Sequence, residues 1–105
     1  MDLSELTHLY DFTGQTVAVT GGAGVLGGDI ACALAGCGAN VAILDRVLEP
    51  VPGILERLGP RASQVMAVSC DVLDVESLRQ AAAAVVTKFG AVDCLLNAAG
   101  GNKPQ

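Results

Sequence analysis

Short aliphatic runs alternate with longer segments of helical spacing along most of the chain. Four runs rich in Val, Ile, Leu and Ala predict β-strands at 16–20, 40–45, 65–68 and 92–97. Between them, apolar residues recur at three- and four-residue intervals and predict helices at 25–35, 53–58 and 75–89. Glycines or prolines separate the segments, and Asp74 is a suitable N-cap for the last of these helices. This regular alternation predicts βαβ units with parallel strands.

The fold class that follows is α/β, with a doubly wound parallel sheet between two helical layers. Right-handed crossovers place the strands in the order 3-2-1-4, which is the first half of a Rossmann-type sheet in a three-layer αβα arrangement. We expect an N-terminal arm at 1–14, with a short amphipathic turn, and then a Rossmann domain at 15–105 that stops after the fourth strand. The outer edge of that strand would be bare, and something should cover it.

Composition excludes several classes of protein. Half of the residues are apolar (51%) and only 16% are charged, which excludes a disordered chain. The net charge is −5 and Lys and Arg are scattered singly, so nucleic-acid binding is not expected. No apolar run approaches the ~20 residues that cross a bilayer, and the N-terminus has no cationic secretory signal. A soluble cytoplasmic protein without a membrane partner is therefore expected.

The cysteines do not suggest a metal site. Cys32 and Cys37 flank a helical segment, Cys70 and Cys94 fall at or within strand-like runs, and His8 is far from all four. No paired spacing of the zinc-binding kind occurs. We therefore expect four buried free thiols in a reducing compartment.

A glycine-rich turn follows the first predicted strand. It reads Gly22-Ala23-Gly24-Val25-Leu26-Gly27, a G-x-G-x-x-G pattern that opens a helix within a βαβ unit. The first glycine permits a tight turn, the second allows close approach of a pyrophosphate, and the third lets the helix pack close to the strand. Free N–H groups and the helix dipole would hold the diphosphate without a cation. The predicted binding residues are Gly21, Ala23, Gly24, Val25, Leu26 and Gly27; the alternative is a turn that binds nothing.

An acidic residue, Asp45, ends the second strand, close to the offset of about 20 residues expected of a ribose-binding acid. Its carboxylate would accept hydrogen bonds from both hydroxyls of the adenosine ribose and repel a 2′-phosphate. NAD is therefore the predicted cofactor and NADP the less favoured one. Arg46 could instead pair with that phosphate. A solvated acid at the strand end is the other interpretation of Asp45.

Two further strand ends carry candidate cofactor contacts. Asp71 would accept a hydrogen bond from the adenine amino group, with Val72 against the ring, or would serve only as a turn residue before the Asp74 helix. Spacing alone leaves both roles open. Asn97 ends the fourth strand at the same edge of the sheet, where ligands bind in open α/β folds. The segment that follows would let a cofactor lie directly on its backbone: Ala98, Ala99 and Gly100.

Three stretches in this order resemble the short-chain dehydrogenase/reductase family, and the likeness covers about 12–103. They are Thr20–Gly27, Cys70–Val72 and Asn97–Gly100. Two positions depart from the family pattern: Val25 replaces the middle glycine of T-G-x-x-x-G-x-G, and Ala98 replaces the second Asn of N-N-A-G. The combination of stretches is similar to oxidoreductases of mannonate and related sugar acids.

The resemblance implies hydride transfer between nicotinamide and an alcohol or carbonyl substrate by a homo-oligomer. It also implies a catalytic Ser and a Tyr-x-x-x-Lys pair beyond the fourth strand. Tyr10 is followed by Gly14 at that spacing, and neither Lys88 nor Lys103 has a tyrosine four residues before it, so no catalytic residue is assigned. The chain alone is expected to be inactive. The competing interpretations are a non-catalytic dinucleotide-binding module or fragment, and an FAD-binding Rossmann domain.

Overall fold

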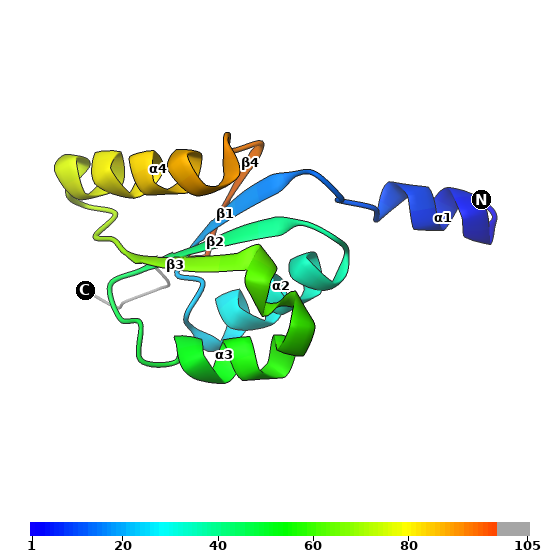
Figure 1. Ribbon diagram of the computed structural model, residues 1–105, viewed down its shortest axis with the longest axis horizontal. Coiled ribbons are helices and arrows are strands. Elements are labelled where there is room, and N and C mark those ends of the chain that lie inside the picture. Colours follow the sequence, from blue (N-terminus) through cyan, green and yellow to red (C-terminus); the bar gives the residue numbers. More distant parts are fainter. Residues whose placement is uncertain (99–105) are drawn as a thin grey trace, which may run out of the picture.

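Four parallel strands formed by the aliphatic runs make one sheet through the middle of the molecule (Figure 1). The computed structural model describes residues 1–98. The strands are β1 (Thr16–Thr20), β2 (Asn40–Asp45), β3 (Val65–Ser69) and β4 (Cys94–Asn97). Their order is β3-β2-β1-β4, which confirms the predicted topology. Thr20 is in register with both Leu44 and Asn97, so the carboxyl ends of the strands meet at one edge.

Helices cover both faces of this sheet, as the αβα prediction requires (Figure 1). On one face lie α2 (Val25–Gly36) and α3 (Val51–Leu58), with the 3₁₀-helix η1 (Gly59–Gln64) after α3; on the other lies α4 (Val75–Phe89). Residues 59–64 had no predicted structure, whereas α4 begins and ends as its sequence predicts. Its N-terminus is capped by the Asp74 carboxylate, which accepts hydrogen bonds from the N–H groups of Glu76 (3.0 Å) and Ser77 (3.4 Å).

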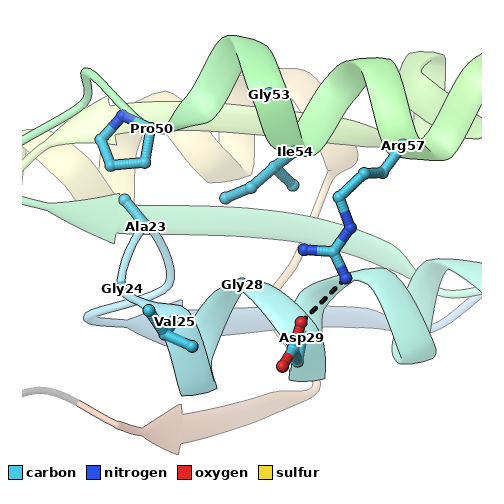
Figure 2. A pocket seen from close by; sticks show the side chains of 9 residues that line it. All are labelled: Ala23, Gly24, Val25, Gly28, Asp29, Pro50, Gly53, Ile54 and Arg57. Atoms are coloured by element: carbon cyan, nitrogen blue, oxygen red, sulfur yellow. Dashed lines mark hydrogen bonds and ion pairs between the residues drawn. The ribbon is translucent and has the colours of Figure 1, made fainter.

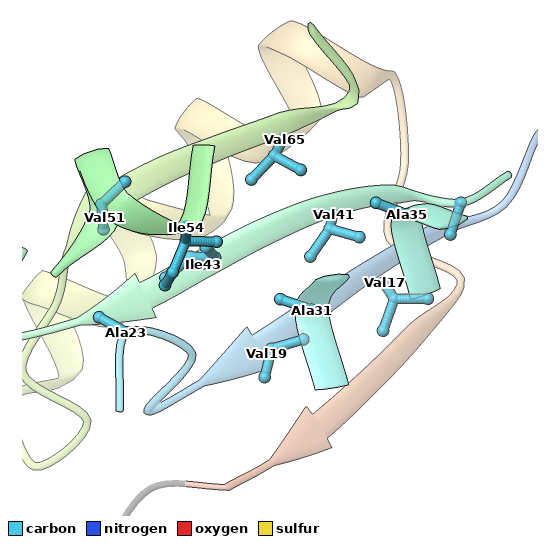
Figure 3. Close-up of a cluster of buried hydrophobic side chains, with 11 residues drawn as sticks. Val17, Val19, Ala23, Ala31, Ala35, Val41, Ile43, Val51, Ile54 and Val65 are labelled. Carbon is cyan, nitrogen blue, oxygen red and sulfur yellow. The ribbon is translucent and has the colours of Figure 1, made fainter. Parts of the chain in front are cut away.

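The core follows from the alternation of side chains along each strand. On β1, Val17 and Val19 pack against α2, while Ala18 belongs to a second cluster on the side of α4. Two small residues of α2, Ala31 and Ala35, are fully buried and let that helix lie close to the sheet (Figure 3). The sheet therefore has an aliphatic layer on each face, as the scarcity of aromatic residues indicates.

Two predicted starts are wrong. The helix α3 begins at Val51 instead of Gly53, because Pro52 lies in its first turn, where a missing N–H group is tolerated. The strand β4 begins at Cys94 instead of Val92. The preceding Asp93 is held at the start of β1: its N–H group donates to the carbonyl of Thr16 (2.9 Å) and its carboxylate accepts from the N–H group of Thr16 (2.8 Å). Two other elements, α2 and β3, each extend one residue beyond the predicted end.

The N-terminal arm forms a helix, α1 (Leu3–Leu9), where the sequence predicted only a turn. Asp2 caps it through a hydrogen bond to the N–H group of Glu5 (2.8 Å). None of its residues is buried, and the helix projects away from the sheet (Figure 1). Within residues 1–98, no helix is long and apolar enough to cross a membrane.

The prediction of four buried thiols is wrong for three of them. Cys70 is buried, Cys32 and Cys37 are partly exposed, and Cys94 is exposed; all four are free. Cys94 lies on the outer strand β4, whereas α4 contacts β2 and β3, so residues 1–98 leave part of β4 uncovered. Leu95 is 64% exposed for the same reason. The described residues contain no group of three or more His, Cys, Asp or Glu side chains that could hold a metal ion.

Candidate functional site

The glycine turn after β1 is held tightly against the ends of β1 and β2. Gly21 adopts φ +69°, in the left-handed region that favours glycine. Its N–H group donates to the carbonyl of Leu44 (2.7 Å), and its carbonyl accepts from the N–H group of Gly24 (3.1 Å). These bonds fix the turn and bring the chain directly into α2 at Val25.

Close packing of α2 onto this turn depends on Gly27, which is buried. A Cβ atom at this position would lie 2.9 Å from both the carbonyl carbon of Gly21 and the Cα atom of Gly22, and would overlap the carbonyl oxygen of Gly21. The third glycine of the pattern therefore allows α2 to pack close to the end of β1, as predicted. The contact is made with Gly21 and Gly22, the two residues that follow β1.

The N-terminus of α2 presents unpaired backbone N–H groups. Its N-cap residue, Gly24, offers no side-chain acceptor. Within the described part of the chain, the N–H groups of Val25 and Leu26 donate to no acceptor. Because the positive end of the helix dipole lies at the same place, this cradle fits a diphosphate group. Two other amides of the turn are already used: that of Gly24 within the turn and that of Ala23 by Asp45.

Asp45 points toward the glycine turn. Its Oδ2 atom accepts a hydrogen bond from the N–H group of Ala23 (3.2 Å), and its Oδ1 atom accepts one from the N–H group of Val47 (3.1 Å). A carboxylate can accept about four hydrogen bonds, so acceptor capacity for ribose hydroxyls remains. The neighbouring Arg46 is exposed and forms no hydrogen bond or ion pair with residues 1–98.

Asp71 follows a residue that is bonded to the end of β2: the N–H group of Cys70 donates to the carbonyl of Asp45 (2.9 Å). The Oδ1 atom of Asp71 accepts from the N–H group of Leu73 (3.0 Å), and its own N–H group donates to Oγ of Ser77 (2.9 Å). Asp71 thus has the turn role that its spacing allowed. Oδ2 of Asp71 has no partner among residues 1–98, and the adenine role stays a prediction. Val72 beside it is half-buried.

Asn97 is held at the same edge by Thr20, a site residue that the sequence reasoning missed. The hydroxyl of Thr20 donates to Oδ1 of Asn97 (2.6 Å), and the N–H group of Ala98 donates to the carbonyl of Thr20 (3.0 Å). The position of Thr20, last in its strand and directly before Gly21, was the available signal. Ala99 and Gly100 lie outside the described residues.

Sequence reasoning also missed a cavity of about 440 Å³ between α2 and α3, beside the glycine turn (Figure 2). Its lining residues come from the turn, from α2 and from the start and body of α3: Ala23, Gly24, Val25, Gly28, Asp29, Pro50, Gly53, Ile54 and Arg57. An ion pair joins Nη2 of Arg57 to Oδ1 of Asp29 (2.8 Å), and this hydrogen bond raises the pKa of Arg57. The two residues are 28 positions apart in the sequence, and no local pattern reveals their contact.

Comparison with known proteins places these features in a family. The family model described as short chain dehydrogenase matches residues 15–105. UxuB of Bacillus subtilis, an uncharacterised oxidoreductase, is 42% identical over 95 residues, which cover 90% of this chain and 34% of that protein. The D-threitol dehydrogenase of Mycolicibacterium smegmatis is 38% identical over 98 residues, covering 91% of this chain and 38% of that protein.

A solved structure agrees with this result. The crystal structure of a proposed D-mannonate oxidoreductase from Haemophilus influenza, with bound NAD, superposes with a TM-score of 0.82 at 29% identity. The match covers 94% of this chain and 35% of that one. The chain thus spans little more than a third of the length of these three proteins.

Proposed function

Because this chain belongs to the short chain dehydrogenase family, we propose that it binds NAD as part of an enzyme that oxidises or reduces a small alcohol or carbonyl compound. The observation that carries the proposal is the contact between Asp45 and Ala23, which puts a carboxylate beside the glycine turn. The NAD bound by a relative of the same fold supports the choice of cofactor. When bound, the nicotinamide supplies or accepts the hydride.

In this proposal the N–H groups of Val25 and Leu26 hold the diphosphate at the N-terminus of α2. Asp45 accepts hydrogen bonds from the adenosine ribose hydroxyls, and its charge disfavours a 2′-phosphate. NAD is therefore preferred to NADP, although the adjacent Arg46 is exposed and could approach such a phosphate.

The adenine and the remainder of the cofactor would contact the neighbouring strand ends. Asp71 and Val72 would contact the adenine. Asn97 and Ala98 provide backbone against which the rest of the cofactor lies, and Thr20 fixes their position through its two hydrogen bonds. These assignments are supported by the common edge at which the strands end.

The substrate we propose is a polyol or sugar acid such as mannonate. Support comes from the D-threitol dehydrogenase and the proposed D-mannonate oxidoreductase to which the chain is similar. The 105 residues contain no Tyr-x-x-x-Lys, so we expect them to bind cofactor without turning over substrate on their own. We also propose that the protein assembles as a homo-oligomer, because α4 keeps Leu78 and Val86 exposed on its surface.

Isothermal titration calorimetry of the purified chain with NADH, NADPH and FAD tests the proposal. We expect NADH to bind most tightly. We further expect Asp45→Asn to bring the affinities for NADH and NADPH within about threefold, because the amide has no charge; its single oxygen can keep the hydrogen bond from Ala23, while the one from Val47 is lost. Glu49→Gln, a neutralised exposed acid four residues away, is the matched control and should retain the wild-type preference.

Two results would contradict the proposal. Failure of wild type to bind either nicotinamide cofactor would leave a module that binds no such ligand, and preferential binding of FAD would favour a flavin-binding domain. Equal cofactor preference in wild type and Asp45→Asn would remove Asp45 from the site.

A further inference from the structure

The cavity between α2 and α3 shares a wall with the proposed cofactor site (Figure 2). Its volume, about 440 Å³, lies within the range of small-ligand pockets, roughly 300–1,000 Å³. One wall is formed by Ala23 and Gly24 of the glycine turn, and the opposite wall by Pro50 and Ile54 of the α3 segment. The cavity therefore opens directly beside the turn that is proposed to hold the cofactor.

One residue connects this cavity to the ribose-binding carboxylate. Ala23 lines the cavity and donates its N–H group to Asp45 (3.2 Å). If Asp45 holds the adenosine ribose as proposed, a phosphate on the 2′-oxygen would lie near either the exposed Arg46 or, past Ala23, the cavity.

The cavity holds one cation and one anion among its nine lining residues, Arg57 and Asp29. Figure 2 shows the guanidinium of Arg57 turned from α3 toward Asp29 on α2, and the two groups are 2.8 Å apart. Their side chains are 55% and 59% exposed. Exposed pairs of this kind contribute little to stability, so the pair can be broken without unfolding the protein.

A guanidinium binds phosphate well because its N–H groups match two phosphate oxygens at once. In this cavity the Arg57 guanidinium is already engaged by a carboxylate, and that carboxylate would also repel the charge of about −1.5 to −2 on a phosphate monoester. Asp29 therefore acts against phosphate binding in two ways: it pairs with the Arg57 guanidinium, and its negative charge repels the phosphate.

We propose that Asp29 is a specificity-determining residue, which disfavours NADP by holding Arg57 away from a 2′-phosphate in the α2–α3 cavity. The inference rests on the proposed NAD binding and adds a second determinant to Asp45. It also assigns a role to an ion pair that lies outside the glycine turn and the strand ends.

The test compares NADH and NADPH titrations of wild type, Asp29→Asn, Arg57→Gln and the double variant. Asp29→Asn should raise the affinity for NADPH roughly tenfold and leave that for NADH within about twofold, because in this proposal only the 2′-phosphate would enter the cavity. The double variant should lose the gain. Asp29→Ser serves as a second substitution of the same carboxylate, and circular dichroism confirms the fold of each variant.

Unchanged NADPH affinity in both Asp29 variants overturns the inference. So does a gain that survives Arg57→Gln but disappears when Arg46→Gln is added to Asp29→Asn, because Arg46 would then be the phosphate-binding group. Failure of wild type to bind NADH is a different result, which refutes the proposed function itself.

Discussion

The contact between Gly27 and the glycine turn offers a direct measurement of how tightly the proposed site is packed. In Gly27→Ala, the new methyl group would lie 2.9 Å from the carbonyl carbon of Gly21 and from the Cα atom of Gly22, closer than real Cβ atoms approach such atoms. Both neighbours are backbone atoms and cannot rotate away. The turn or the first turn of α2 must therefore shift.

The magnitude of this effect can be separated from helix propensity. Alanine in a helix interior is favoured over glycine by about 1 kcal/mol, whereas overpacking of a tight contact costs about 1–3 kcal/mol. Gly36→Ala provides the control, because Gly36 belongs to the same helix and a Cβ atom there would meet nothing within 4 Å. We expect Gly27→Ala to be less stable than Gly36→Ala by about 1–3 kcal/mol.

Urea unfolding followed by circular dichroism measures the difference in stability, and an NADH titration measures its consequence for the site. Displacement of the turn moves the N–H groups of α2, so Gly27→Ala should bind NADH at least about tenfold more weakly, while Gly36→Ala should bind it like wild type. Equal stability and equal NADH affinity in the two variants would refute the claim that α2 packs directly onto the turn.

Three local contacts give further predictions. Thr20→Val should lower the free energy of unfolding by about 1 kcal/mol, measured in urea, because the hydrogen bond to Asn97 is lost; an unchanged value would show that this bond contributes nothing. Asp74→Ala should lower the free energy of unfolding by about 1 kcal/mol because the α4 cap is lost, whereas Asp74→Asn should keep most of the stability that the cap contributes. The Thr13 hydroxyl and N–H group both donate to Asp11 and lower its pKa below 3.8. The contact is therefore complete above that pH and lost as the pH falls through the lowered pKa; an NMR titration midpoint at 3.8 would contradict this.

The sequence predicts the elements whose ends are set by local chemistry. Asp74 and Gly90 bound α4 through a side-chain cap and a left-handed residue, and the structure has this helix over the predicted range, 75–89. The strand order also follows, because right-handed crossovers leave few arrangements of four strands. The close packing of Gly27 is equally local, since a Cβ atom there would meet Gly21 and Gly22, only a few residues away.

Several features that the sequence does not predict depend on contacts between distant positions. The start of β4 is set by Asp93, which bonds Thr16 from 77 residues away. The exposure of Cys94 depends on α4 lying over β2 and β3, which hydrophobic periodicity does not specify. The ion pair of Asp29 and Arg57 likewise exists only once α2 and α3 lie side by side.

The hydrogen bond between Asp45 and Ala23 sets a constraint on anyone who redesigns the cofactor preference of this protein. The carboxylate that is proposed to bind the ribose also stabilises the glycine turn, because it accepts a hydrogen bond from the N–H group of Ala23. Asp45→Ala, made to admit NADP, removes the hydrogen bond to Ala23 together with the charge, and should weaken the affinity for both cofactors. Asparagine at position 45 removes the charge and can still accept the hydrogen bond from the N–H group of Ala23, at the cost of the one from Val47, so it alters the cofactor preference with less damage to the turn than alanine.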